Sequence, residues 1–252
     1  MTIGIIGAMP EEIALLSDRL ENITRQKRGT RNYLQGSLFG KKLVLVFSGW
    51  GKVAGASTAT TLIEKFGVDF ILFTGVAGAV ADDLQIGDIV VADKLIQHDL
   101  DASGVPGIKR YEVPLLGIST FALEPRWVEL AKKSAGRYLA EDLAKDVPTE
   151  LRAEFGITSP QVRTGLIISG DQFIASTAEL RRLRTELPDA QCVEMEGAAV
   201  AQVCHEHGIP LAVLRTMSDK SDHSASINFP SFIRKIASHF TCGIAGKFIQ
   251  EV

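Results

Sequence analysis

Cysteine is scarce in this chain, and its scarcity excludes several classes of protein. Three cysteines occur in 252 residues, at Cys192, Cys204 and Cys242, without the spacing of a metal ligand set or a redox pair. This usage excludes a disulfide framework and predicts buried thiols in a reducing, cytoplasmic compartment. No apolar run is long enough to span a bilayer. The N-terminus turns acidic at Glu11 and Glu12 and lacks the basic start of a signal peptide, so we expect a first strand there.

The chain also lacks a strong charge bias. Lys and Arg number 27 against 30 Asp and Glu, which gives a formal net charge of −3. Hydrophobic residues make up 46% and charged residues 23%, so the composition indicates neither a disordered chain nor a polycation that binds nucleic acid. We therefore expect no nucleic-acid or membrane partner. Because no repeat, low-complexity tract or linker interrupts the chain, we predict one domain over residues 1–252.

Short apolar runs alternate with helical patterns along the chain. The runs typical of buried strands are Ile3–Ala8, Lys42–Ser48, Phe70–Gly75, Asp88–Ala92, Leu166–Ser169 and Leu211–Thr216. The helical patterns cover Pro10–Leu20, Val53–Phe66, Thr177–Glu186, Gly197–His207 and Pro230–Ile249, with each proline expected in a first turn. The alternation predicts an α/β fold, a three-layer sandwich around a mixed, mostly parallel central sheet. Tyr33–Phe39 and the run after it predict an antiparallel hairpin, which makes the sheet mixed.

Residues 101–163 are the least regular part of the chain. They hold five of the nine prolines and a long charged helix around Arg126–Lys145. They also contain a loop, residues 103–118, with an unusual number of apolar side chains: Val105, Ile108, Tyr111, Val113, Leu115, Leu116 and Ile118. A long loop of this kind is either functional, as an interface or a ligand groove, or a surface excursion.

Several turns that follow the predicted strands have both a functional and a structural interpretation. GIIGAMPEE, residues 4–12, is not the GxGxxG fingerprint of dinucleotide binding. Gly7 could admit a ligand and Glu12 could point into a cleft, but the helix dipole alone explains an acid in the first turn better. The glycine turns at residues 48–56 and 73–92 have two interpretations. They let the backbone approach a sugar or a phosphate, or they allow tight packing of a strand against a helix. In SGDQFI, residues 169–174, Phe173 is either a stacking platform for a base or a core residue.

The most informative stretch is VEMEGAAVAQVCHE, residues 193–206, followed by LRTMSDKSD, residues 214–222. Glu194 and Glu196 flank Met195 at the entrance to an apolar helical run. About twenty residues further on, Arg215 and Asp219 end a predicted buried strand. Charged side chains at strand ends beside an apolar core indicate a functional site.

The order of these motifs is similar to that of a known family. GIIGAMPEE, SGWGKV, TGVAGA, GDIVVAD, QHDLD, SGDQFI, VEMEGAA and RTMSD occur in sequence over residues 4–220. Together they resemble the nucleoside phosphorylase and hydrolase family, and within it the 5'-methylthioadenosine/S-adenosylhomocysteine nucleosidases. The tripeptide Glu194–Glu196 with Ser218–Asp219 is the most specific part, and the resemblance fails between about residues 103 and 163. It implies hydrolysis of the N-glycosidic bond of 5'-substituted adenosines.

The resemblance implies three catalytic residues. Asp219 matches the acid that protonates adenine N7, so that the base leaves neutral; burial could supply the raised pKa that this needs. Glu12 matches the base that activates the attacking water, and Arg215 matches the residue that helps to hold it. The transition state then carries oxocarbenium charge on the ribose.

The resemblance also implies a nucleoside pocket without metal or cofactor. Phe173 is expected to stack on adenine while the backbone of Ile174 reads its edge. Glu196 is expected to bind the ribose hydroxyls, with Met195 packed on the sugar. The other residues expected at the pocket are Met9, Trp50, Val76, Ala77, Gly78, Glu194, Ser218 and Phe229. The family further implies a homodimer in which the loop at residues 103–118 lies near the partner's pocket.

The chain departs from the family pattern at two positions, and three other functions remain open. Val76 stands where the family usually has Ser or Thr, and Ala79 stands in place of Gly. A phosphorylase would need arginines around phosphate, but Arg215 is the only arginine in a matched motif, and Glu12 would repel the anion. A hydrolase of futalosine-type nucleosides is the second alternative. A nucleoside-sensing binding module, supported only by Val76, is the third.

Overall fold

The computed structural model describes residues 1–223 and 225–252 of the chain. Its strands are β1 Thr2–Gly7, β2 Glu21–Arg28, β3 Arg31–Leu38, β4 Lys41–Phe47, β5 Phe70–Ala79, β6 Ile89–Gln97, β7 Phe121–Ala122, β8 Val162–Ser169, β9 Ala190–Glu194 and β10 Leu211–Asp219. Its helices are α1 Pro10–Asp18, α2 Lys52–Phe66, α3 Pro125–Glu141, α4 Leu143–Asp146, α5 Thr149–Glu154, α6 Thr177–Glu186, α7 Gly197–His207, α8 Ala225–Phe232, the π-helix η1 Ile233–Ala237 and α9 Ser238–Glu251.

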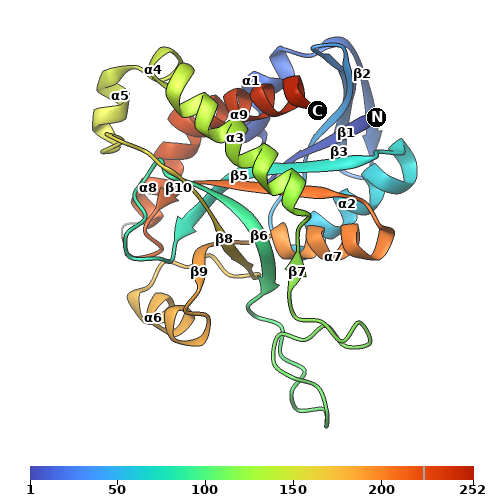
Figure 1. Cartoon of the computed structure of the whole chain (residues 1–252), viewed down its shortest axis with the longest axis vertical. Helices are drawn as coiled ribbons and strands as arrows, with labels where there is room; N and C mark the ends of the chain where they lie inside the picture. The colour runs from blue at the N-terminus through green and yellow to red at the C-terminus, as the bar shows by residue number, and fades with distance from the viewer. Residues whose placement is uncertain (224) are drawn as a thin grey trace.

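One mixed sheet joins the strands, in the order β10-β6-β8-β9-β5-β1-β4-β3-β2. Because β10 also pairs with β5, five strands close into a ring, from which β1 to β4 extend as an open sheet. β1 pairs in parallel with both β4 and β5, and β5 pairs in parallel with β10. Helices α1, α3 and α9 cover one face of the sheet, and α2 and α7 cover the other (Figure 1). The predicted α/β fold is therefore confirmed, and so is the antiparallel hairpin, formed by β3 and β4.

The fold differs from the sequence prediction in several features, and β7 and α5 are among the elements that were not predicted. β2 was not predicted because its side chains are almost all exposed, so it has no alternation of buried and exposed residues. β9 was not predicted because its five residues are too short for a clear pattern. Pro230 lies inside α8, not in a first turn, since the helix begins at Ala225. The π-helix η1 begins at Ile233, three residues after Pro230, which removes one hydrogen bond from α8.

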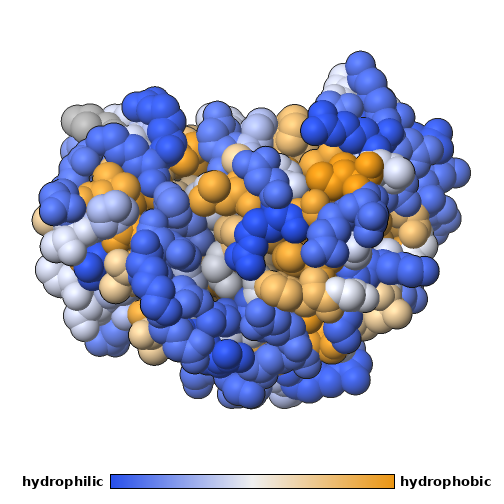
Figure 2. Space-filling view, turned by 90° about the horizontal axis from the view of Figure 1, so that it is seen from above, coloured by the Kyte–Doolittle hydropathy of each residue, from blue (hydrophilic) through white to orange (hydrophobic). Residues whose placement is uncertain are grey.

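The long charged helix is confirmed as α3, with an end at Glu141 that is earlier than predicted. Its buried face consists of Val128, Ala131, Ser134, Ala135 and Tyr138, at helical spacing. Ion pairs tie α3 to the C-terminal helix, with Arg137 Nη1 at 2.6 Å from Glu251 Oε1. The face of the molecule seen from above Figure 1 is largely hydrophilic, with smaller apolar areas between charged residues (Figure 2). The buried apolar side chains lie between the helices and the sheet and form the core.

The loop at residues 103–118 projects away from the sheet (Figure 1). An isolated antiparallel β-bridge joins Val113 to Ile118 within the loop. The Tyr111 hydroxyl donates to Glu186 Oε2 of α6 at 3.1 Å. Leu115, by contrast, is fully exposed, and Val105 is 54% exposed. The loop is therefore anchored at its base and presents apolar side chains to solvent at its tip.

The three cysteines are buried thiols, as the sequence predicts. Cys192, Cys204 and Cys242 are free and buried. No helix within residues 1–223 and 225–252 is long and apolar enough to cross a membrane.

Candidate active site

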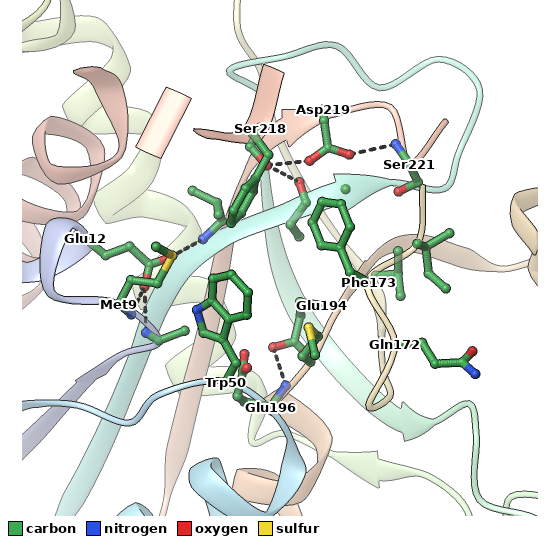
Figure 3. Close-up of a pocket in the computed structure, with 18 residues that line it drawn as sticks. Met9, Glu12, Trp50, Gln172, Phe173, Glu194, Glu196, Ser218, Asp219 and Ser221 are labelled. Atoms are coloured by element: carbon green, nitrogen blue, oxygen red, sulfur yellow. Dashed lines mark hydrogen bonds between the residues drawn. The ribbon is translucent and has the colours of Figure 1, made fainter. Parts of the chain in front are cut away.

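A pocket that is open to solvent lies where the carboxyl ends of several strands meet. β1, β5 and β10 run in parallel and end on one side of it. The end of β9 meets β5 there through the pair Gly78 and Val193, and β8 ends beside β9. Ligands of α/β proteins bind at such strand ends, because the loops that follow converge there. The pocket is lined by Ala8, Met9, Glu12, Trp50, Val76, Ala77, Gly78, Gln172, Phe173, Ile174, Val193, Glu194, Met195, Glu196, Ser218, Asp219, Ser221 and Phe229 (Figure 3).

Glu12 is held at the base of the pocket by backbone donors. Its Oε2 accepts from the amides of Ala8 and Met9 at 2.6 and 2.9 Å, and its Oε1 accepts from Val76 N at 3.0 Å. Burial raises the pKa of Glu12, while the positive charge of Arg215 and these amides act in the opposite direction. A Cβ at Gly75 would lie 2.7 Å from Oε1, so only glycine leaves room for the carboxylate.

Asp219 lies at the end of β10, between two serines. Its Oδ2 accepts from the Ser218 hydroxyl at 2.7 Å and its Oδ1 accepts from Ser221 N at 2.8 Å. Burial raises the pKa of Asp219, although both hydrogen bonds act to lower it. A carboxyl group of this kind stays protonated to a higher pH than an ordinary aspartate and can act as a general acid.

Glu194 and Arg215 form a buried ion pair behind the pocket surface. Arg215 Nη2 lies 2.7 Å from Glu194 Oε2, and Nη1 donates to the carbonyl of Leu214 at 3.0 Å. The guanidinium also lies over the ring of Phe73, at 4.0 Å from its centroid. Glu194 further accepts from the Ser169 hydroxyl and from Gly197 N at the start of α7. The pair fixes the end of β9 against β10.

Glu196 closes the other side of the pocket, before α7. Its Oε1 accepts from Gly51 N at 2.7 Å. Burial, and then the negative charge of Glu194, raise the pKa of Glu196. The next residue after Gly51, Lys52, is held by two acids: its amide donates to Asp171 Oδ1 at 2.7 Å and its ammonium lies 2.6 Å from Asp99 Oδ1. These contacts join the loop that binds Glu196 to the loop that carries Phe173.

Aromatic side chains line the mouth of the pocket. The rings of Phe173 and Phe229 meet edge to face, with centroids 5.3 Å apart. Trp50 meets Phe229 in the same way at 6.2 Å. Phe173 is 43% exposed and Trp50 is 56% exposed, while Ile174 is buried beneath the loop. Partly exposed aromatic rings around a concave site can stack on a flat base.

The structure brings every predicted site residue to this pocket except Arg215. Arg215 is not part of the lining, because its guanidinium is buried against Glu194 and Phe73. Four lining residues were not predicted: Ala8, Gln172, Val193 and Ser221. Ala8, Gln172 and Val193 each adjoin a predicted residue, and Ser221 lies two positions after Asp219 in the same motif, so position within a motif was the only signal in the sequence. Among the described residues, no group of three or more His, Cys, Asp or Glu is arranged to hold a metal ion.

Comparison with known proteins gives consistent results over the whole chain. The family model of the phosphorylase superfamily matches residues 2–250. A 5'-methylthioadenosine/S-adenosylhomocysteine nucleosidase from Anoxybacillus flavithermus is 36% identical over 239 residues, which is 95% of this chain and 94% of that protein.

Solved structures are similar over the same range. The nucleosidase of this name from Neisseria meningitidis, in complex with methylthio-immucillin-A, is 31% identical with a TM-score of 0.87, and the match covers 100% of this chain and 99% of that one. The futalosine hydrolase of Helicobacter pylori is 32% identical with a TM-score of 0.84, covering 100% and 98%. The chain therefore belongs to the phosphorylase superfamily, and within it to the 5'-methylthioadenosine/S-adenosylhomocysteine nucleosidases.

Proposed function

We propose that this protein hydrolyses the N-glycosidic bond of 5'-methylthioadenosine and S-adenosylhomocysteine, releasing adenine and the 5'-substituted ribose. The observation that carries the proposal is the pair of buried carboxyl groups, Glu12 and Asp219, in one pocket lined by aromatic rings. Their surroundings differ, and two carboxyl groups in different surroundings can serve as base and acid of one reaction.

Asp219 is the general acid of the proposed reaction. Adenine is a poor leaving group as an anion, so a proton delivered to N7 lets it leave neutral. Burial raises the pKa of Asp219 and so favours the protonated form that a general acid needs. Phe173 stacks on the departing base, and the backbone of Ile174 contacts its edge.

Glu12 is the base that takes a proton from the attacking water. Three backbone amides fix its carboxylate, so it needs little rearrangement when the water attacks C1' from the face opposite adenine. Arg215 acts at a distance: its charge favours ionised Glu12 and its ion pair holds Glu194. We therefore revise its role from direct contact with the water to support of the two carboxylates.

Glu196 binds the ribose hydroxyls in this proposal. Its Oε2 carries no hydrogen bond from the described part of the chain, whereas Oε1 is bound to Gly51. Met195 lines the pocket beside it and packs on the sugar. Carboxylates that bind ribose hydroxyls strengthen those contacts as the sugar gains oxocarbenium character.

The chemistry of the lining favours water over phosphate as the nucleophile. Among the described residues that line the pocket there is no Arg, Lys or His. Phosphorolysis needs such groups to hold the anion, and Arg215, which lies behind the pocket surface, is already paired with Glu194. Binding without turnover would have no need of both Glu12 and Asp219 in their buried positions.

One alternative substrate class has direct support. The similarity to a futalosine hydrolase, at 32% identity over the whole chain, extends to the same fold and superfamily. The two substrate classes share the ribose and the N-glycosidic bond. Glu12, Asp219 and Glu196 would serve either substrate in the same roles.

We further propose that the protein is a homodimer in the cytoplasm. The exposed apolar tip of the loop at residues 103–118, including Leu115, supports an interface that places this loop near the partner's pocket. Three free, buried thiols support a reducing compartment. One domain over residues 1–252 is supported by the single sheet that includes strands from β1 to β10.

The experiment that tests the proposal is release of free base from a nucleoside panel, with and without phosphate. The panel contains 5'-methylthioadenosine, S-adenosylhomocysteine, adenosine and futalosine. We expect adenine from the two 5'-thio nucleosides at equal rates in both buffers, with a free 5'-substituted ribose. Base release that requires phosphate and yields a ribose 1-phosphate would overturn hydrolysis. Turnover of futalosine alone would keep the reaction and change the substrate.

A further inference from the structure

Ser221 is a pocket residue whose side chain has no partner in the protein. Its side chain is fully buried, and its hydroxyl has no hydrogen-bond partner within the described residues. Buried hydroxyls are normally hydrogen-bonded, because burial without a partner is costly. An unpaired hydroxyl in the lining of a binding pocket therefore indicates a partner that arrives with the ligand.

The backbone of Ser221 adopts a strained conformation next to Asp219. Its φ is +54°, in the left-handed region that a serine rarely adopts. Its amide is committed to Asp219 Oδ1 at 2.8 Å, which fixes the turn. Strain of this kind persists where the surrounding structure requires it, often at a binding site.

The hydroxyl lies beside Asp219, over Gly78. A Cβ added at Gly78 would collide with Ser221 Oγ and would lie 2.9 Å from Asp219 Oδ1. The Ser221 hydroxyl and the Asp219 carboxylate therefore both lie against Gly78 of β5. In Figure 3, Ser221 and Asp219 lie side by side at the end of the pocket where Phe173 also lies.

The chemistry of a purine decides what this hydroxyl can reach. If Asp219 protonates N7, the neighbours of N7 along the purine edge are C8–H and the substituent at position 6. C8–H is a poor hydrogen-bond partner, whereas a 6-amino group is a good donor. Both oxygens of Asp219 already accept protein hydrogen bonds, from Ser218 and from the Ser221 amide, but Ser221 Oγ has its full capacity free.

We propose that the Ser221 hydroxyl accepts a hydrogen bond from the 6-amino group of the substrate base and so contributes to selection of 6-aminopurines. This role rests on the proposed nucleosidase function and adds a specificity residue to it. The roles are separate: Asp219 supplies the proton, and Ser221 recognises the group next to the atom that receives it.

The test compares two substrates in three forms of the enzyme. The substrates are 5'-methylthioadenosine and its analogue with hydrogen at position 6, and the enzymes are wild type, Ser221→Ala and Ser221→Gly. We expect Ser221→Ala to lower kcat/KM for the 6-amino substrate by about five- to tenfold, the effect of one hydrogen bond. The change for the 6-unsubstituted analogue should be less than about twofold, because it never made the bond.

Ser221→Gly separates the hydroxyl from the backbone. Glycine adopts the left-handed conformation freely, so this variant removes the hydroxyl without adding strain. It should show the same selective loss as Ser221→Ala, and binding of free adenine relative to free purine should weaken in parallel. Melting temperatures of the three proteins identify a variant that has lost its fold.

Two outcomes would overturn the inference. Equal losses on both substrates would mean that Ser221 only shapes the turn around Asp219. Unchanged kinetics on both would mean that the hydroxyl does not contact the base. Failure of the proposed function is a different result, since wild-type enzyme would then release base from neither nucleoside.

Discussion

Arg215 and Glu194 form an ion pair that is almost completely buried, with Nη2 and Oε2 2.7 Å apart. The pair connects the middle of β10 to the end of β9, and the arginine charge also acts on Glu12. Removal of one partner of such a pair leaves the other as an unpaired charge in a medium of low polarity, which is strongly destabilising.

We expect Arg215→Met to lower the free energy of unfolding by about 3–5 kcal/mol. The double variant Arg215→Met with Glu194→Gln should recover part of this loss, because it removes the orphaned charge. Urea unfolding of the two single variants and the double variant measures the coupling. Equal stability of Arg215→Met and wild type would show that the pair is not buried in solution.

Asp219→Asn should reduce kcat by about 10²–10⁴-fold while nucleoside affinity changes little. The amide retains the shape of the side chain but has no proton to deliver to N7. Stopped-flow turnover and equilibrium binding of a nucleoside measure the two effects separately. Asp189→Asn is a matched control, since that carboxylate is 80% exposed and pairs only loosely with Lys94 at 4.0 Å. Near-normal turnover of Asp219→Asn would remove Asp219 from the role of acid.

Glu12→Gln should be as damaging as Asp219→Asn, for a different reason. Glutamine cannot accept the proton of the attacking water, and its amide nitrogen would face backbone donors that now contact the carboxylate. Single-turnover kinetics should show a loss in the chemical step of about 10²-fold or more. A normal rate would mean that another group activates the water.

The pH dependence of kcat/KM should be bell-shaped, with both limbs set by perturbed carboxyl groups. Glu12 must be ionised to act, so activity falls as pH decreases through its raised pKa. Asp219 must be protonated, so activity falls as pH increases through its own raised pKa. Because Arg215 lowers the pKa of Glu12, Arg215→Met should shift the acidic limb to higher pH. A shift to lower pH would contradict this assignment.

Val76→Ser should raise kcat, by no more than about tenfold. The backbone amide of Val76 donates to Glu12 Oε1 at 3.0 Å, so a hydroxyl at this position could add one more hydrogen bond near the water. One such bond contributes about 0.5–1.5 kcal/mol. Steady-state kinetics with 5'-methylthioadenosine measures the change, and Val76→Ala is the control for lost packing. A large loss in both variants would mean that the valine packs against the substrate or the core.

Leu115→Ala should weaken dimerisation and reduce the use of alkylthio nucleosides more than that of adenosine. Leu115 is fully exposed in the single chain, where it has no packing role. Sedimentation velocity measures the assembly, and kcat/KM for 5'-methylthioadenosine relative to adenosine measures the contribution to the 5' site. A fully active wild-type monomer would exclude a shared pocket.

The sequence alone determined the layered α/β fold and most of the pocket. Buried parallel strands such as β5 are continuous apolar runs, so their positions are readable from composition. The acids at 194, 196 and 219 stand out because charges next to such runs are unusual, whereas the role of Glu12 came only from the family resemblance. β2 and β9 were missed because an exposed edge strand and a strand of five residues carry little periodicity.

Only the tertiary structure decided which groups touch. The ring closed by β5 and β10 brings Asp219 next to Gly78, 141 positions earlier in the chain, and no local pattern encodes that contact. Arg215 appeared from its motif to face the water, yet burial directs its guanidinium to Glu194. The sequence could place Ser221 in a motif but could not show its unpaired hydroxyl, which is a property of its three-dimensional surroundings. Periodicity records what a side chain does within its own strand or helix, whereas hydrogen bonding and burial depend on segments that meet only in the folded chain.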